Sequence, residues 1–119
     1  GEYTGSFQFV TEGTKTWVHS DHHTDWSCLV YLHPEPIHNS GTSFYKHIES
    51  GSRMYSDNDG ETIEGDGSDY DKWTREDVIS NVYNRAIIFR GDLWHAADKY
   101  FGEDMKTGRL FQTFFFNEV

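Results

Sequence analysis

The stretch Ser27-Cys-Leu-Val-Tyr-Leu-His33 decides the fold class. It is a short apolar run rich in β-branched and aromatic residues, and it is closed by Pro34-Glu-Pro36. A run of this length and composition between turn residues is typical of a strand, in which alternate side chains share a face. Alternation predicts that one face of this strand carries Ser27, Leu29, Tyr31 and His33.

Further runs of the same kind follow one another along the chain. They occupy 6–11, 16–19, 42–47, 85–89, 93–97 and 109–117, with Gly, Pro, Asn and Asp between them. Short strands separated by turn signals predict an all-β sandwich or barrel. A chain of 119 residues forms one domain, 1–119, and its 17% aromatic content indicates a core of few, large side chains.

The middle of the chain differs in composition, and we expect 51–83 to be an insertion. Residues 56–71 are acidic and Gly-rich with almost nothing to bury, which is typical of a solvated excursion. Thr74-Arg-Glu-Asp77 has the pattern of a helix N-cap followed by an acidic first turn, and it predicts a short helix over 75–82.

The charge balance narrows the choice of partner. Ten Lys and Arg against twenty Asp and Glu give a net charge of -10, which argues against nucleic acid and anionic membrane surfaces. No apolar run approaches a membrane span, and a single cysteine, Cys28, forms no internal disulfide. We expect a cytoplasmic protein that acts on a small molecule or a peptide.

The segment Trp17-Val-His-Ser-Asp-His-His-Thr-Asp-Trp26 contains His-x-Asp twice. Two imidazoles and one carboxylate form the facial triad that suits non-haem Fe(II). His95, in the run 93–97, offers a second histidine from a distant strand. On spacing alone, a metal site and scattered surface histidines both remain open. The last run raises a separate question, because a buried Arg109 on a face with Phe111 and Thr113 needs an anion.

Six motifs occur in a particular order: His19-Ser-Asp21, Leu29-Val-Tyr-Leu32, Ser40-Gly-Thr-Ser-Phe44, Asn84-Arg-Ala-Ile-Ile-Phe-Arg-Gly91, His95 and Gly108-Arg109. This order resembles the catalytic half of the 2-oxoglutarate/Fe(II)-dependent dioxygenases, and within them the prolyl-4-hydroxylase-like branch. The resemblance runs from about residue 17 to 116 and implies a double-stranded β-helix, a cupin-like jelly roll.

The resemblance also implies roles for individual residues. His19, Asp21 and His95 would bind Fe(II), and Arg109 would pair with the distal carboxylate of the cosubstrate 2-oxoglutarate. Tyr31 would join that carboxylate, and Thr113 and Thr42 would line the cosubstrate pocket. The reaction would use O₂ to hydroxylate a substrate and would release succinate and CO₂.

The family pattern favours His19/Asp21 over His23/Asp25, because it has a loop of several residues between the metal-binding Asp and the Tyr-Leu strand. Asp25 directly precedes that strand. His22, His23 and Asp25 would then lie at the rim of the site. The remaining histidines, His33, His38 and His47, are expected in surface or packing roles.

Two departures from the family pattern leave alternatives open. Only eighteen residues precede His19, where the family has further strands and helices. The chain is then a minimal version, a piece of a longer protein, or one half of a homodimer. Phe111 also stands where some relatives have a hydroxyl. The alternative functions are a cupin-like metalloprotein that does not use 2-oxoglutarate and a non-enzymatic jelly-roll binding module; Arg109 and Tyr31 favour the dioxygenase.

Overall fold

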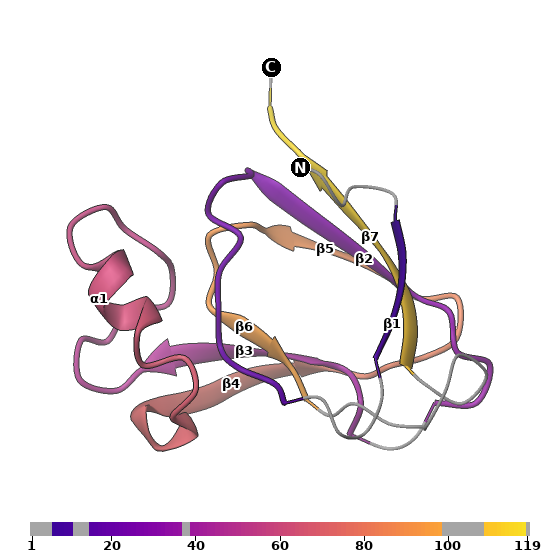
Figure 1. Ribbon diagram of the computed structural model, residues 1–119, viewed down its shortest axis with the longest axis horizontal. Helices are drawn as coiled ribbons and strands as arrows, with labels where there is room; N and C mark the ends of the chain where they lie inside the picture. The colour runs from indigo at the N-terminus through magenta and orange to yellow at the C-terminus, as the bar shows by residue number, and fades with distance from the viewer. Residues whose placement is uncertain (1–5, 11–14, 37–38, 99–108, 119) are drawn as a thin grey trace.

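Two antiparallel sheets form the framework of the computed structural model, which describes residues 6–10, 15–36, 39–98 and 109–118 (Figure 1). The first sheet has the strand order β1-β7-β2-β5 and the second β4-β3-β6. The elements, in chain order, are β1 (Ser6–Val10), β2 (Trp26–Tyr31), β3 (Thr42–His47), α1 (Gly60–Glu64), the 3₁₀ turn η1 (Tyr70–Lys72), β4 (Trp73–Ile79), β5 (Ala86–Arg90), β6 (His95–Ala97) and β7 (Arg109–Phe116). The expectation of a mainly β chain is confirmed.

Most of the predicted strands form, with small shifts at their ends. The deciding stretch becomes β2, which pairs with β5 on one side and β7 on the other. The run 42–47 is β3, as predicted. In the run 93–97, Leu93 forms an isolated bridge with Met54 and the strand begins only at His95. The run 16–19 forms no strand but a single bridge between His19 and His95. No helix in the described part is long and apolar enough to cross a membrane.

The predicted helix over 75–82 is wrong. Residues Trp73–Ile79 form β4, which pairs with β3 along its whole length, so 51–83 is not wholly an insertion outside the sheets. The N-cap pattern at Thr74 is a local signal, and it is overridden by pairing with β3 and by burial of Trp73, which is 5% exposed. The short helix of this region is α1, which lies earlier in the chain.

The acidic segment buries more than its composition indicates, so the expectation of a purely solvated excursion is also wrong. Ile63 of α1 is 3% exposed and belongs to the hydrophobic core. The other members of that core are Val18, Tyr45, Trp73, Trp94 and Ala96.

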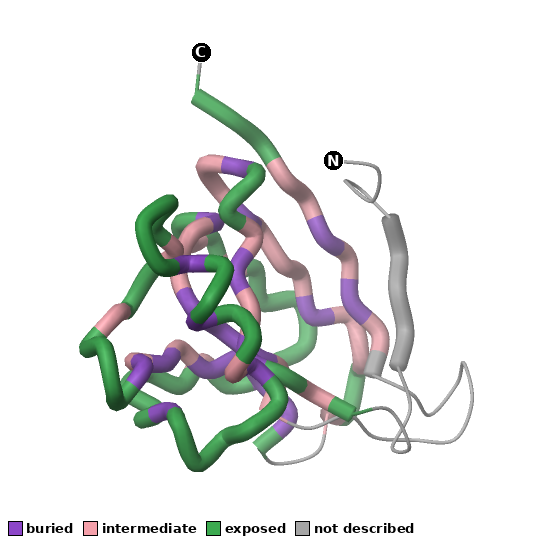
Figure 2. Tube along the Cα trace, turned by 60° about the vertical axis from the view of Figure 1, so that its left-hand side comes forward, coloured by how far each residue is buried: buried purple, intermediate pink, exposed green. Residues whose placement is uncertain are grey.

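The last strand, β7, is covered along most of its length. Its positions are buried or half-buried as far as Phe115, and exposed positions begin at Phe116 (Figure 2).

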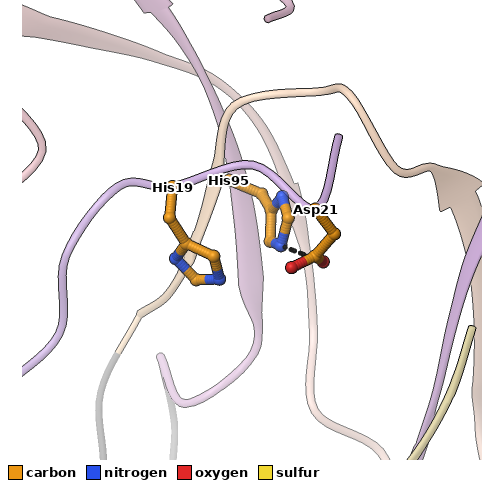
Figure 3. A group of neighbouring side chains, drawn as sticks. All are labelled: His19, Asp21 and His95. Carbon is orange, nitrogen blue, oxygen red and sulfur yellow. Dashed lines mark ion pairs between the residues drawn. The ribbon is translucent and has the colours of Figure 1, made fainter. Parts of the chain in front are cut away.

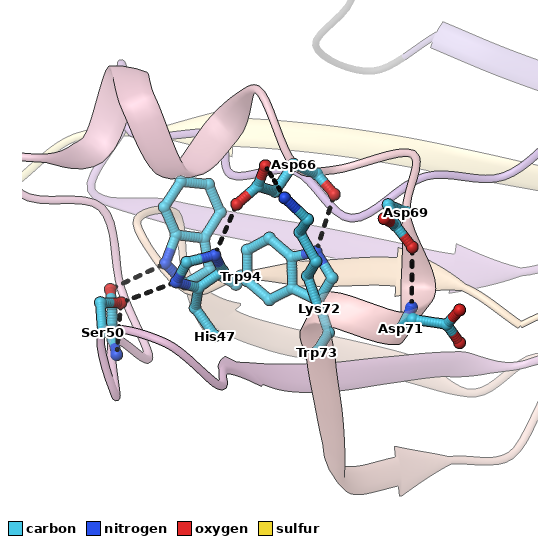
Figure 4. Close-up of polar contacts among 9 residues, drawn as sticks. His47, Ser50, Asp66, Asp69, Asp71, Lys72, Trp73 and Trp94 are labelled. Atoms are coloured by element: carbon cyan, nitrogen blue, oxygen red, sulfur yellow. Dashed lines mark hydrogen bonds and ion pairs between the residues drawn. The ribbon is translucent and has the colours of Figure 1, made fainter.

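His47 joins the acidic segment to β3, although no partner for it could be predicted from the sequence. Its side chain is buried; Nδ1 lies 2.8 Å from Ser50 Oγ, and Nε2 lies 2.8 Å from Asp66 Oδ2 (Figure 4). Lys72 Nζ also donates to Asp66, at 3.2 Å, and the indole of Trp73 donates to the Asp66 carbonyl. Asp66 therefore connects the acidic segment to the strands on either side of it.

Because of Asp66, the stability of the protein should depend on pH in the acid range. The hydrogen bonds from His47 and Lys72 hold the pKa of its carboxyl below the ordinary value of 3.8. The stabilisation is therefore complete above the ordinary pKa of 3.8 and is lost as the pH falls from there through the lowered pKa of the folded state. We expect Asp66→Asn to lower the melting temperature at neutral pH, and the variant and wild-type curves to converge in acid. Asp71→Asn, an exposed carboxyl in the same segment, is the control and should show no such convergence.

Candidate metal centre

His19 and Asp21, from one segment, come together with His95 from a distant part of the chain (Figure 3). The backbones of His19 and His95 exchange two N–H···O hydrogen bonds of 2.9 Å each, which places their rings 4.5 Å apart, centroid to centroid. Asp21 is held next to them because its N–H donates to the carbonyl of Gly91, at 2.7 Å. One ligand atom from each of the three side chains lies within 4.8 Å of the other two.

Gly91 is required where the ligand loop meets the turn after β5. A Cβ at this position would lie 2.2 Å from the carbonyl oxygen of Thr24 and 2.6 Å from that of Asp21, so only glycine allows the approach. Ser27 then fixes the Asp21 carboxylate, because its hydroxyl donates to Oδ2 at 3.2 Å. Ser27 on β2 thus orients the Asp21 carboxylate, and Gly91 holds the backbone of the loop that carries Asp21.

In both histidines, Nδ1 forms a hydrogen bond with a backbone carbonyl outside the site. His19 Nδ1 lies 3.0 Å from the carbonyl oxygen of Trp17, and His95 Nδ1 lies 2.8 Å from that of Leu93. A carbonyl oxygen only accepts, so each Nδ1 carries the proton and each Nε2 is left with its lone pair. His95 Nε2 nevertheless lies 3.2 Å from Asp21 Oδ2. Two acceptors at this distance require a cation or a further proton between them.

Burial also favours the neutral form of the His19 imidazole, which is the form that can bind a metal. Desolvation, reinforced by the nearby His95, lowers the pKa of His19 from 6.5 to about 4, so its imidazole is neutral at physiological pH. For Asp21, desolvation acts to raise the pKa, but the hydrogen bond and charge of His95, the charge of His19 and the hydrogen bond from Ser27 together lower it below 3.8. The site therefore holds a neutral imidazole and a carboxylate, the protonation states that metal binding requires.

A cavity of about 420 Å³ lies against the three residues. Its walls come from both sheets and include four aromatic residues, Trp17, Phe89, Phe111 and Phe115, together with Leu29 and Thr113. Phe89 also packs against His95, with 4.8 Å between ring centroids. A cavity of this size that combines apolar walls with a group of polar side chains is typical of a small-molecule site.

The residues expected to bind 2-oxoglutarate are only partly placed at this cavity. Thr42 and Thr113 line it. Tyr31 is fully buried, and its hydroxyl lies 2.6 Å from Thr42 Oγ1, so it reaches the cavity wall through that threonine. Arg109 begins β7, but its side chain lies outside the described residues.

The second His-x-Asp pair does not join the group. His23 is exposed and packs its ring near Phe115, 5.9 Å between centroids. The Asp25 carboxylate instead accepts from the backbone N–H of Glu118, at 2.8 Å. His22 is also exposed, and its ring stacks on Tyr55 at 3.6 Å. Among the described residues, the one candidate metal-binding group is therefore His19, Asp21 and His95.

Several residues of the site were missed by the sequence. Ser27 was predicted to lie on the same face of its strand as Leu29. Its contact with the Asp21 carboxylate was not predicted, although this facing is consistent with it. Trp17, which is 48% exposed and lines the cavity, was also not identified, although alternation in the predicted strand 16–19 places it on the same face as His19. Of the other histidines, His33 lies beyond the end of β2, and His38 is outside the described residues.

Comparisons with protein-family models, with curated proteins and with solved structures found no match to this chain.

Proposed function

We propose that the chain is an Fe(II)- and 2-oxoglutarate-dependent dioxygenase that hydroxylates a small-molecule or peptide substrate. The observation that carries the proposal is the arrangement of His19, Asp21 and His95. Two imidazole Nε2 atoms and one carboxylate converge at an aromatic cavity, and the 3.2 Å approach of His95 Nε2 to Asp21 Oδ2 requires a positive charge there. Two histidines and one carboxylate are the donor set of non-haem Fe(II) oxygenases.

The order of the strands supports the finer assignment of the fold as a double-stranded β-helix. From β2 onward the chain passes between the two sheets at every connection except that between β3 and β4. The His19 segment continues this alternation, because its bridge to His95 places it beside β6. It would be the eighth strand of a jelly roll, reduced here to a single bridge.

Fe(II) held by His19, Asp21 and His95 would supply oxidative decarboxylation of 2-oxoglutarate with O₂, which yields succinate, CO₂ and a hydroxylated substrate. The residues of the chain have other tasks. The carbonyl oxygens of Trp17 and Leu93 hold both imidazoles with Nε2 toward the site. The aromatic walls restrict access of water to the site.

Arg109 is assigned to the cosubstrate in this proposal. It is the first residue of β7, two positions before the cavity residue Phe111. A guanidinium there would pair with the distal carboxylate of 2-oxoglutarate in bidentate geometry. Tyr31 would act through its hydroxyl partner Thr42, which lines the cavity.

Arg109→Ala is expected to separate metal binding from cosubstrate binding. Loss of a bidentate Arg–carboxylate pair should weaken 2-oxoglutarate binding by about 100-fold, in line with 2–5 kcal/mol for a buried charge pair, while Fe(II) binding is retained. The measurement is an anaerobic titration of the Fe(II)-loaded protein with 2-oxoglutarate, followed by visible absorption, together with succinate release in air. Arg85→Ala, an exposed arginine outside the cavity, is the matched control.

The same titration distinguishes the alternatives. A cupin-like metalloprotein would bind Fe(II) but show no absorption change with 2-oxoglutarate. A binding module would bind neither. Wild-type 2-oxoglutarate affinity in Arg109→Ala would overturn the assignment of this residue while leaving the metal centre in place.

A further inference from the structure

A second and larger cavity, of about 630 Å³, lies between the two sheets at the side where both sheets end. β4 is the last strand of one sheet and β5 is the last strand of the other, and no described strand pairs with the free edge of either (Figure 1). The apolar walls of the cavity include Val78 and Ile79 of β4 and Ile87, Ile88 and Phe89 of β5. The cavity therefore opens between two unpaired strand edges.

Two phenylalanines separate this cavity from the candidate metal centre. Phe44 and Phe89 both line it, and their rings pack edge to face with 5.2 Å between centroids. The Phe89 ring also packs against His95, at 4.8 Å, and Phe89 is the one described residue that lines both cavities. The larger cavity is therefore a site of its own rather than an extension of the metal cavity.

The strand register places the Asp77 side chain on the cavity side of β4. Asp77 is paired with Phe44, and Ile79 is paired with Thr42. Residues directly opposite each other in an antiparallel pair share a face of the sheet. Phe44 and Ile79 line the larger cavity and Thr42 lines the metal cavity, so this face is the one between the sheets. Asp77 therefore places a carboxylate at an apolar wall.

The other charged side chains that line the cavity leave Asp77 without a counter-ion. Arg53 donates to both carboxylate oxygens of Glu76, at 2.7 and 3.0 Å, so these two charges neutralise each other. Lys46 is a further cation near Glu76, but it does not line the cavity. Among the described residues, the Asp77 carboxylate has no hydrogen-bond or ion-pair partner. The lining therefore carries one unpaired negative charge.

We propose that this cavity binds a small-molecule amine, whose apolar body packs between β4 and β5 and whose ammonium group pairs with Asp77. A cavity of this volume, with apolar walls and few polar groups, is typical of a small-ligand site. Both Asp77 and the net charge of -10 attract an ammonium group, whereas they repel a ligand that carries a carboxylate. The site needs no metal, so it stands apart from the proposed dioxygenase activity.

Titration of the metal-free chain with n-hexylamine, hexan-1-ol and hexanoate at neutral pH, followed by amide NMR shifts, tests the proposal. The three compounds share an apolar body and differ in charge. We expect hexylamine to bind about fivefold more tightly than hexan-1-ol, the upper end for an exposed ion pair, and hexanoate to bind most weakly. The shifts should concentrate on β4 and β5. Lengthening the amine from butyl to hexyl should tighten binding about fourfold per CH₂ group.

Two substitutions separate the charge from the apolar body. Asp77→Asn should abolish the preference for hexylamine over hexan-1-ol, and Ile87→Ala should weaken both compounds alike. Asp71→Asn, an exposed carboxyl outside the cavity, is the control for the overall negative charge and should keep the preference. The proposal is overturned if the wild type does not prefer hexylamine, if Asp77→Asn keeps the preference, if Ile87→Ala changes neither affinity, or if the shifts lie in the metal cavity. Asp77 would then be an inward charge that discourages pairing along the edge of β4.

Discussion

Replacing Asp21 with alanine is expected to reduce Fe(II) affinity by more than about 100-fold, beyond the 10–100-fold that loss of an outer-sphere partner costs. His19→Ala and His95→Ala should behave alike. The reason is that each removes one of three donors whose ligand atoms lie within 4.8 Å of one another, and no other described carboxylate or histidine replaces it. Anaerobic equilibrium dialysis with Fe(II), combined with circular dichroism to establish folding, is the measurement.

The neighbouring motif supplies matched controls for this experiment. His23→Ala and Asp25→Ala remove the same residue types from the same loop, yet His23 is exposed and Asp25 accepts from the backbone of Glu118. Both variants should bind Fe(II) as the wild type does. Loss of binding in His23→Ala but not in His19→Ala would show that the other His-x-Asp pair holds the metal.

Trp94→Ala is expected to lower the free energy of unfolding by about 3–5 kcal/mol, the range for large aromatic residues deleted from a core. Trp94 is 0% exposed, its ring lies 5.5 Å from that of Trp73, centroid to centroid, and its indole N–H donates to Ser52 Oγ at 3.0 Å. The substitution leaves a cavity in the core between the acidic segment and β3, while the Ser52 hydroxyl keeps its hydrogen bond to the Met54 carbonyl at 2.8 Å. Urea unfolding followed by far-ultraviolet circular dichroism measures the change.

Trp17→Ala is the control for this prediction, since Trp17 is the same residue type but is 48% exposed. Its effect on stability should be much smaller than that of Trp94→Ala. Trp94→Phe, which keeps most of the ring volume but not the N–H group, should fall between the two. Equal losses for the two alanine variants would mean that the core around Trp94 does not determine the stability of the chain.

The sequence was sufficient to predict most of the strands and the grouping of His19, Asp21 and His95. In β2 and β7, alternate residues share a face, so the grouping of Ser27 with Leu29 and Tyr31, and of Phe111 with Thr113, could be predicted from the residues alone. The grouping of the three donors depends on a His-x-Asp motif and one distant histidine, and the family resemblance gave their order. Their backbone pairing, however, is visible only in the structure.

The failures have a common physical cause. At Thr74 the local pattern fits a helix start, and only contact with β3 and burial of Trp73 determine that the segment is a strand. Likewise, the contact between His47 and Asp66 joins β3 to a segment with no periodicity. Such contacts are set by the tertiary structure, and neither spacing nor composition predicts them.

The acidic segment has a consequence for how freely this chain can change in length. The N–H of Val18 donates to the carbonyl of Gly67 at 2.9 Å, directly before His19. A Cβ on Gly67 would lie 2.3 Å from the Val18 carbonyl oxygen, so the two backbones are in close contact. Surface loops ordinarily tolerate insertions and deletions across evolution. Here, a change in the length of this loop would displace His19, nearly fifty positions away. Selection on the candidate metal centre should therefore also constrain the length of this acidic segment.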